Sequence, residues 1–235
     1  MSDPICITYS FDFDDGRDKT FVIKLDRESL NYLNDMDNGA PDWADLTYQQ
    51  CSNCPLSQTG HIYCPVAYNL VNLTEKFSSI QSHENVFVSV VTEDRTYKKR
   101  TTIDEALSSL MGIIMVTSGC PVLDHFKPMV RFHLPFASAA ETTFRSLSMF
   151  LLAKFLLHKE SNSHSVNFDM DEFENIFTAI NEVNNDFSGR LRAAGEKDAN
   201  LSALANLDCN ATLVSLTIEE TLNQLREYYT AYLKT

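Results

Sequence analysis

Residues 6–25 read CITYSFDFDDGRDKTFVIKL, and this stretch predicts a β-hairpin. Apolar residues occupy every second position of its first half, so one face of a strand collects them. These positions are Ile7, Tyr9, Phe11 and Phe13, continued on the return strand by Phe21, Ile23 and Leu25. Asp15 and Gly16 supply the turn, because glycine tolerates the positive φ that a tight hairpin demands. We therefore expect the chain to begin with two antiparallel strands.

A second hairpin is expected between residues 86 and 100. Val86, Val88 and Val90 alternate with residues that are themselves partly apolar, which predicts a strand in the middle of a sheet. Residues 92–95 make the turn, and the basic run at 97–100 is typical of an edge strand that lysine keeps solvated. Together the two hairpins predict a small antiparallel sheet.

Helical periodicity dominates the rest of the chain. Apolar residues three and four positions apart predict helices over 65–79, 104–116, 138–158, 173–191 and 217–233. The segments 138–141 and 217–220 have the pattern of capping boxes, which begin helices. We predict an α+β fold with one domain over 1–235. Residues 1–102 hold both hairpins, a cysteine-bearing loop and one helix, and 103–235 form a mainly helical half.

The charge of the chain excludes several classes of partner. Its 235 residues include 32 acidic residues against 19 Lys and Arg, a formal net charge of -13. Such a chain repels phosphate backbones and anionic lipid, so we expect neither nucleic-acid nor membrane binding. A protein partner with a basic surface is compatible with this charge. No long apolar run and no signal-peptide pattern is present, so we expect a cytoplasmic protein of undecided oligomeric state.

Four of the six cysteines form the strongest chemical pattern in the sequence. Cys51 and Cys54 end a Cys-x-x-Cys loop, a spacing that lets two sulfurs reach one metal ion. Cys64 adds a third thiolate, and Cys120 is the candidate for the fourth. Cys120 lies between the stop of one helix and a possible start of the next, where a thiol is expected to have a lowered pKa. His61 is the alternative fourth ligand.

The identity of the metal stays open between two choices. This soft ligand set excludes Mg2+ and Ca2+ and favours zinc or an iron–sulfur cluster. Zinc in a closed four-ligand site would be structural and would clip the long loop onto the helical half. An iron–sulfur cluster would indicate a redox or sensor protein. A redox pair at Cys51 and Cys54 and a set of unligated thiols are further alternatives, and Cys6 and Cys209 are expected to be buried as small apolar residues.

A second candidate site lies in the helical half. His133 follows an apolar segment just before the helix expected at 138, and Glu141 and Arg145 share one face of that helix. If the three converge, they would form the pocket of an enzyme or ligand-binding module. His133 and Glu141 would then act as acid and base, and Arg145 would bind an anion. The simpler alternative assigns Glu141 to the cap, Arg145 to helix pairing and His133 to a structural hydrogen bond. The sequence does not decide whether a reaction is catalysed.

Several segments resemble an uncharacterised bacterial family of unknown function. They are CPVAYNL at 64–70, SLMGIIM at 109–115, SGCP at 118–121 and RFHLPF at 131–136. The resemblance extends over most of the chain and implies a bacterial cytosolic source. It brings no established activity, cofactor or catalytic residue to any position.

Overall fold

The computed structural model describes residues 3–34, 39–57, 60–161, 169–195 and 198–233. A four-stranded antiparallel sheet has the order β2-β1-β3-β4. Its strands are β1 (Ile5–Phe13), β2 (Asp18–Leu25), β3 (Asn85–Val91) and β4 (Thr96–Thr102). The two predicted hairpins are joined by antiparallel pairing of β1 with β3, in which Phe11 lies opposite Val88. The α+β fold, the interior position of β3 and the edge position of the basic strand β4 are confirmed.

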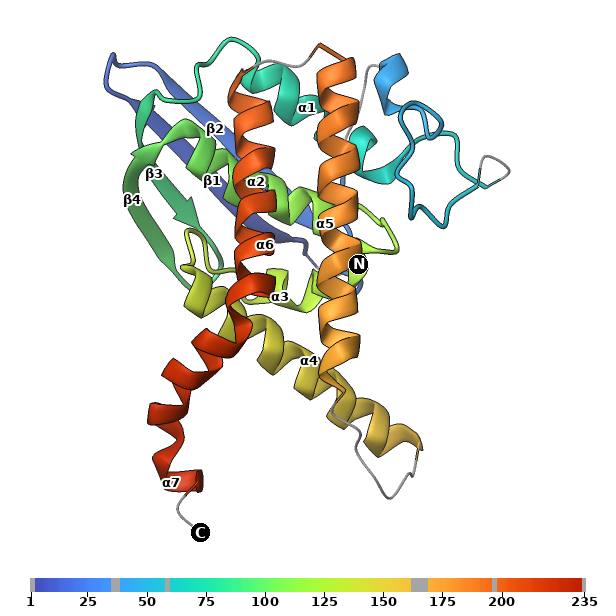
Figure 1. The fold of residues 1–235 in the computed structure, drawn as a ribbon. Coiled ribbons are helices and arrows are strands. Elements are labelled where there is room, and N and C mark those ends of the chain that lie inside the picture. Colours follow the sequence, from blue (N-terminus) through green and yellow to red (C-terminus); the bar gives the residue numbers. More distant parts are fainter. Residues whose placement is uncertain (1–2, 35–38, 58–59, 162–168, 196–197, 234–235) are drawn as a thin grey trace.

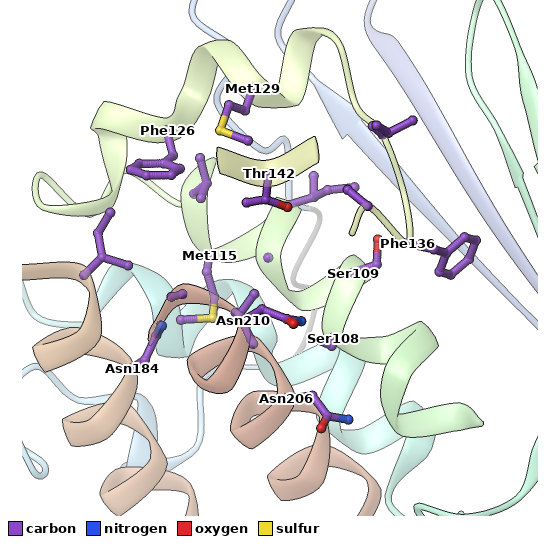
Figure 2. Close-up of a pocket in the computed structure, with 18 of the residues that line it drawn as sticks. Ser108, Ser109, Met115, Phe126, Met129, Phe136, Thr142, Asn184, Asn206 and Asn210 are labelled. Carbon is purple, nitrogen blue, oxygen red and sulfur yellow. The ribbon is translucent and has the colours of Figure 1, made fainter. Parts of the chain in front are cut away.

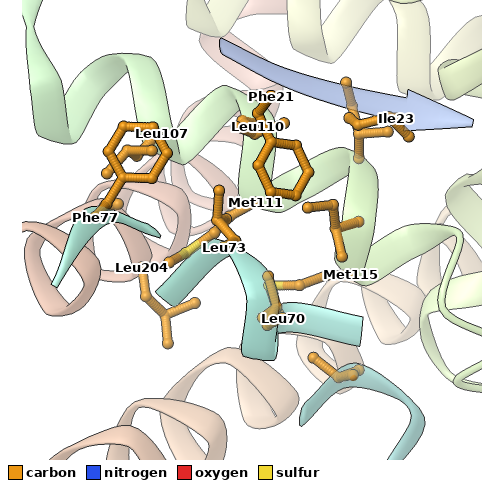
Figure 3. Close-up of a cluster of buried hydrophobic side chains, with 14 of the residues drawn as sticks. Phe21, Ile23, Leu70, Leu73, Phe77, Leu107, Leu110, Met111, Met115 and Leu204 are labelled. Carbon is orange, nitrogen blue, oxygen red and sulfur yellow. The ribbon is translucent and has the colours of Figure 1, made fainter. Parts of the chain in front are cut away.

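One face of the sheet is covered by two helices. On β1 every second residue from Ile5 to Phe13 is buried, as the alternation predicted. The covering helices are α1 (Pro65–Phe77) and α2 (Ile103–Val116). Phe21 and Ile23 of β2 extend toward α2 and α1, where the labelled side chains gather in one layer (Figure 3). Burying one such side chain fully contributes about 1.5–3 kcal/mol, so this layer is a main source of the stability of the fold.

Three long helices make the outer layer, α4 (Ala139–Ser161), α5 (Met170–Ala193) and α6 (Asp198–Arg226). In Figure 1, α6 lies in front of α2, and α5 runs beside α6. Gly112 of α2 faces α6 closely, since an added Cβ would lie 3.4 Å from Cδ1 of Leu207, at the limit of ordinary contact. Short elements complete the described chain: η1 (Asp42–Ala44), η2 (Leu123–Phe126), α3 (Lys127–Arg131), η3 (Glu227–Tyr229) and α7 (Thr230–Leu233).

The two predicted capping boxes have different outcomes. Ser138 and Glu141 form the first box, since the Ser138 amide donates to the Glu141 carboxylate at 2.8 Å and the Glu141 amide to Ser138 Oγ at 3.2 Å. The second box is wrong as a helix start, because α6 is one helix that includes Thr217, although it bends by 59° between Val214 and Leu216. The Thr217 hydroxyl instead donates to the Leu213 carbonyl at 2.7 Å, one turn earlier in the same helix. Val214 and Ile218, before and after Thr217, are buried in one apolar cluster, which favours a helix that includes Thr217.

In the part of the chain that is described, no single helix is long and apolar enough to cross a membrane. One bent pair, Asp198–Val214 with Leu216–Leu233, reaches the length and composition of a span with a bend of 59°.

Candidate thiol site and helical pocket

The loop that carries Cys51 and Cys54 is fixed to α5 by its two intervening residues. The amide and hydroxyl of Ser52 both donate to Oδ2 of Asp186, at 2.7 and 2.8 Å. The side-chain amide of Asn53 donates to the Ala179 carbonyl at 2.8 Å. The Cys54 amide closes a turn onto the Cys51 carbonyl at 3.1 Å. These contacts hold both cysteines against one side of α5.

Arg190 of α5 holds the beginning of the same irregular segment. Its side chain is fully buried, and its guanidinium donates to three carbonyl oxygens, of Trp43 at 2.9 Å, Asp45 at 2.7 Å and Leu46 at 3.2 Å. No ion pair of Arg190 with a carboxylate is found among the described residues. A buried cation with only neutral acceptors is unusual, because buried charges are generally paired.

The sequence analysis missed the role of Arg190, although one signal points to it. Arg190 lies three residues after Phe187 and seven after Val183, on the apolar side of α5. A charged residue within an apolar helical stripe is either neutralised or strongly hydrogen-bonded when the helix packs. The sequence could have identified Arg190 as a buried cation, but the carbonyl groups that it binds come from a segment without periodicity.

The structure brings together the segments that carry the four candidate cysteines. Cys64 is the N-cap residue of α1 and is buried, as is Cys120 after α2, while Cys51 and Cys54 are half-buried. Burial raises the pKa of both Cys51 and Cys120, and negative charge on Cys64 and on Cys54 raises both further. The side-chain amide of Asn69 donates to the carbonyl oxygens of both Pro65 and Ser118, at 2.9 and 3.2 Å, and Pro55 and Pro121 line one hollow, so the segments that carry the cysteines are neighbours.

The predicted lowering of the Cys120 pKa is wrong. No helix begins at the following proline, since the chain turns there and enters η2 only at Leu123. Burial therefore raises the pKa of Cys120, and backbone N–H groups of Leu123 and Val122 offset part of this effect. For Cys51, burial raises the pKa to about 12, and the nearby positive charge of Arg190 acts in the opposite direction. As thiols these residues are protonated at neutral pH.

The thiols are gathered but are not converged on one point. Among the described residues, no group of three or more His, Cys, Asp or Glu side chains is arranged to hold a metal ion. His61, the alternative ligand, is exposed. Cys6 and Cys209 are exposed as well, so the expectation that they are buried is wrong.

His133 belongs to a buried chain of hydrogen bonds that starts in the sheet. Its Nε2 lies 2.6 Å from the hydroxyl of Tyr9, which lies 2.9 Å from Oγ of Ser109 on α2. Burial, with a smaller contribution from Arg145, lowers the pKa of His133 to about 3, and burial raises the pKa of Tyr9. The imidazole is therefore neutral, and the chain links the segment before α4 to the sheet and α2.

The other two residues of this candidate group also have structural contacts. Arg145 donates to the carbonyl oxygens of Met129 and Phe132, at 2.9 and 2.8 Å. Hydrogen bonds from Ser138 lower the pKa of Glu141, which keeps this capping carboxylate charged. Arg145 lies within electrostatic reach of both His133 and Glu141. The three predicted residues are thus neighbours, and each is already engaged by the fold.

A cavity of about 610 Å³ lies beside this group, between α2, α3, α4, α5 and α6. Its walls are largely apolar, with Met115, Met129 and Phe126 among them, and Asn184, Asn206 and Asn210 line the α5 and α6 side (Figure 2). His133 and Arg145 line the cavity, whereas Glu141 is not among its lining residues. The sequence analysis did not identify the asparagines, because nothing in their spacing distinguishes them from solvated helix positions.

Comparison with known proteins gives a family and no activity. The family model described as Domain of unknown function (DUF6901) matches residues 7–230. No curated protein and no solved structure matches the chain significantly. The resemblance to a family of unknown function is thereby confirmed, and the sites rest on their own geometry.

Proposed function

We propose that this protein, which belongs to the DUF6901 family, binds a thiophilic metal ion through Cys51, Cys54, Cys64 and Cys120. Zinc is the first candidate, with a structural role. The observation that supports the proposal is that the three segments carrying these cysteines are neighbours, and that the buried Arg190 holds the beginning of the same irregular stretch. A closed set of four ligands leaves no position for a substrate, so we assign the metal to folding and not to catalysis.

The charge of Arg190 supports a thiolate site in particular. Four thiolates around one Zn2+ carry a net charge of about −2, which a low-dielectric interior disfavours without a counter-charge. Arg190 supplies positive charge that reaches Cys51, and it has no carboxylate partner among the described residues. A metal–thiolate centre would therefore neutralise the guanidinium, and the guanidinium would stabilise the centre.

The consequence of binding would be the fixing of an irregular segment. Residues 41–57 and 60–64 contain one short 3-10 helix and contribute three buried residues, Ala44, Leu46 and Cys64. Ordering each residue of such a segment costs about 1–2 kcal/mol of backbone entropy, and little apolar burial offsets this cost. A bound metal would join the segment to α1 and to the chain after α2, which stabilises the fold on binding.

Metal content of protein purified without oxygen tests the proposal. We expect one zinc per chain in colourless protein, lost in Cys64→Ser and Cys120→Ser and retained in the matched control Cys209→Ser, whose thiol is exposed. Iron with visible absorption in place of zinc would support the iron–sulfur alternative at the same cysteines. Protein that binds neither metal after reconstitution under reducing conditions, with all six thiols reactive in the native state, would contradict both.

A second candidate function rests on the cavity beside His133 and Arg145. Its volume of about 610 Å³ is within the range of small-molecule sites. The apolar walls and the amide groups of α5 and α6 favour an elongated, largely apolar ligand with neutral hydrogen-bonding groups. Acid–base chemistry by His133 receives less support, because its pKa of about 3 keeps the ring neutral and its Nε2 is bonded to Tyr9.

Filling the cavity tests this second function. Ala211 lines the cavity on α6, whereas Ala205 on the same helix is exposed, so tryptophan at these two positions gives a matched pair. We expect an uncharged lipophilic fluorophore to bind the wild-type protein and Ala205→Trp equally, and Ala211→Trp about tenfold more weakly. Equal binding by both variants would place the fluorophore elsewhere and remove this support for the function.

A further inference from the structure

Two helical arms extend beyond the body of the protein and expose large apolar side chains. One arm is the second half of α4, and the other is the end of α6 with η3 and α7 (Figure 1). Eleven large apolar residues on them are at least 36% exposed. They are Leu151, Leu152, Phe155, Leu156 and Leu157 on the first arm, and Leu213, Leu216, Tyr228, Tyr229, Tyr232 and Leu233 on the second.

Apolar side chains are buried at the base of each arm and exposed along the arm itself. Where they leave the body, Phe150 of α4, Phe173 and Phe177 of α5, and Val214 and Ile218 of α6 form a small buried cluster. Beyond Phe150 the sequence LLAKFLL at 151–157 has no buried position. A helix that is apolar around most of its circumference is normally covered on more than one side.

The exposed apolar area is larger than a monomer usually shows. At about 100 Å² for each partly exposed large side chain, the eleven residues present on the order of 1,000 Å². The largest apolar patch of a typical monomer is about 300–600 Å², and one partner of a stable complex buries about 800 Å². The arms therefore have the area that a stable dimer requires.

The charges on the arms favour contact between unlike arms. The first arm carries Lys154, Lys159 and Glu160, a net charge of +1, and the second carries Glu219, Glu220, Arg226 and Glu227, a net charge of −2. Lys154 is already paired with Glu172 of α5, so Lys159 is the cation available to a second copy. In a twofold dimer, α4 of each protomer can lie against α6 and α7 of its partner, so the same pair of contacts forms twice. The opposite signs favour this arrangement, and the acidic second arm disfavours an anionic membrane as the covering surface.

We propose that the two arms form an isologous dimer interface between two copies of this chain. A hollow of about 560 Å³ between the first arm and α5, lined by Ala153 and Leu157 of α4 and by Ile176 and Ala179 of α5, offers a place for a large side chain of the second copy. The hollow also reaches Pro55 and Pro121, so the interface would border the segments that carry Cys54 and Cys120.

Sedimentation equilibrium of the full chain tests the proposal. We expect twice the chain mass of 26.6 kDa for the wild-type protein, with a dissociation constant in the micromolar range or below. Leu152→Glu on the first arm and Leu216→Glu on the second should each weaken the dimer at least tenfold. Leu33→Glu is the matched control, because Leu33 is 43% exposed but lies far from the arms in sequence, and this variant should dimerise like the wild type.

The far-UV circular dichroism of each variant shows whether it is folded, which exposed positions should permit. A wild-type protein that sediments as a single chain at every concentration would overturn the proposal. A dimer unchanged by both Leu152→Glu and Leu216→Glu would overturn it as well. Binding of the single chain to phosphatidylcholine–phosphatidylglycerol vesicles, lost in the same two variants, would assign the arms to a membrane surface instead.

Discussion

The sheet with α1 and α2 and the segment around the cysteines are held by different forces. In the first region nearly every inward side chain is apolar and fully buried, and contact between them needs no specific partner. In the second region the described residues from 41 to 64 bury only three side chains, and hydrogen bonds from α5 fix the backbone. The first region therefore tolerates conservative exchange, while the second depends on a few individual polar groups.

The largest loss of stability is expected from substitution of Arg190, which holds the segment around the cysteines. Arg190→Ala removes three hydrogen bonds and takes the guanidinium donor from the carbonyl groups of Trp43, Asp45 and Leu46, of which Asp45 keeps the Tyr48 amide. We expect a loss of about 4 kcal/mol in the free energy of unfolding, measured in urea. Arg192→Ala on the exposed side of the same helix should change it by less than about 0.5 kcal/mol. Similar values for both variants would show that Arg190 does not hold the segment.

A substitution in the sheet core tests whether this core and the segment around the cysteines are stabilised independently. Leu110 of α2 is fully buried beneath the sheet (Figure 3), so Leu110→Ala leaves a cavity and should cost about 3 kcal/mol of stability. Because Leu110 is held by apolar contact alone, the folded variant should keep the zinc content of the wild type. Loss of zinc in folded Leu110→Ala protein would show that the two regions are not independent.

The half-buried imidazole of His133 predicts a dependence of stability on pH. The folded pKa of His133 is about 3, below the ordinary value of 6.5, so the unfolded chain takes up a proton that the folded protein does not. The neutral His133 therefore costs the folded protein stability as the pH falls below 6.5. At pH 5 the free energy of unfolding should be about 2 kcal/mol lower than at pH 7. Urea unfolding at both pH values should show a smaller loss for His133→Gln. The exposed control His125→Gln should lose as much as the wild type.

The smallest expected change in stability comes from substitutions in the two segments with the capping-box pattern. Ser138→Ala removes an observed cap and should cost about 1 kcal/mol in thermal or urea unfolding. Thr217→Ala removes a hydroxyl that is bonded within a continuous helix, and its cost should be less than about 0.5 kcal/mol. The reverse order would mean that a helix boundary lies near Thr217.

These contrasts also explain what the sequence could and could not predict. Alternation in β1 and β2 and the helical spacing in α1 and α2 follow directly from burial, so the sheet and its cover were predicted closely. Thr217 shows the limit of a local signal, because packing along α6 overrides it. The metal site of four cysteines remains a prediction, because among the described residues the side chains are not arranged as metal ligands.

What the sequence could not predict depends on contacts between distant segments. Arg190 binds carbonyl groups almost 150 residues earlier, and the hydrogen bond between Tyr9 and His133 joins a strand to a segment more than 120 residues later. Neither contact has a periodic or short-range pattern. The cavity beside α2 depends in the same way on five separate elements, so it is visible only in the folded chain.

X-ray absorption at the zinc edge of reconstituted protein tests the central claim most directly. The account predicts four sulfur neighbours at about 2.3 Å from each bound zinc, falling to three or fewer in Cys120→Ser. Zinc surrounded only by nitrogen and oxygen, or a sulfur count that Cys120→Ser leaves unchanged, would contradict a shared site of Cys51, Cys54, Cys64 and Cys120.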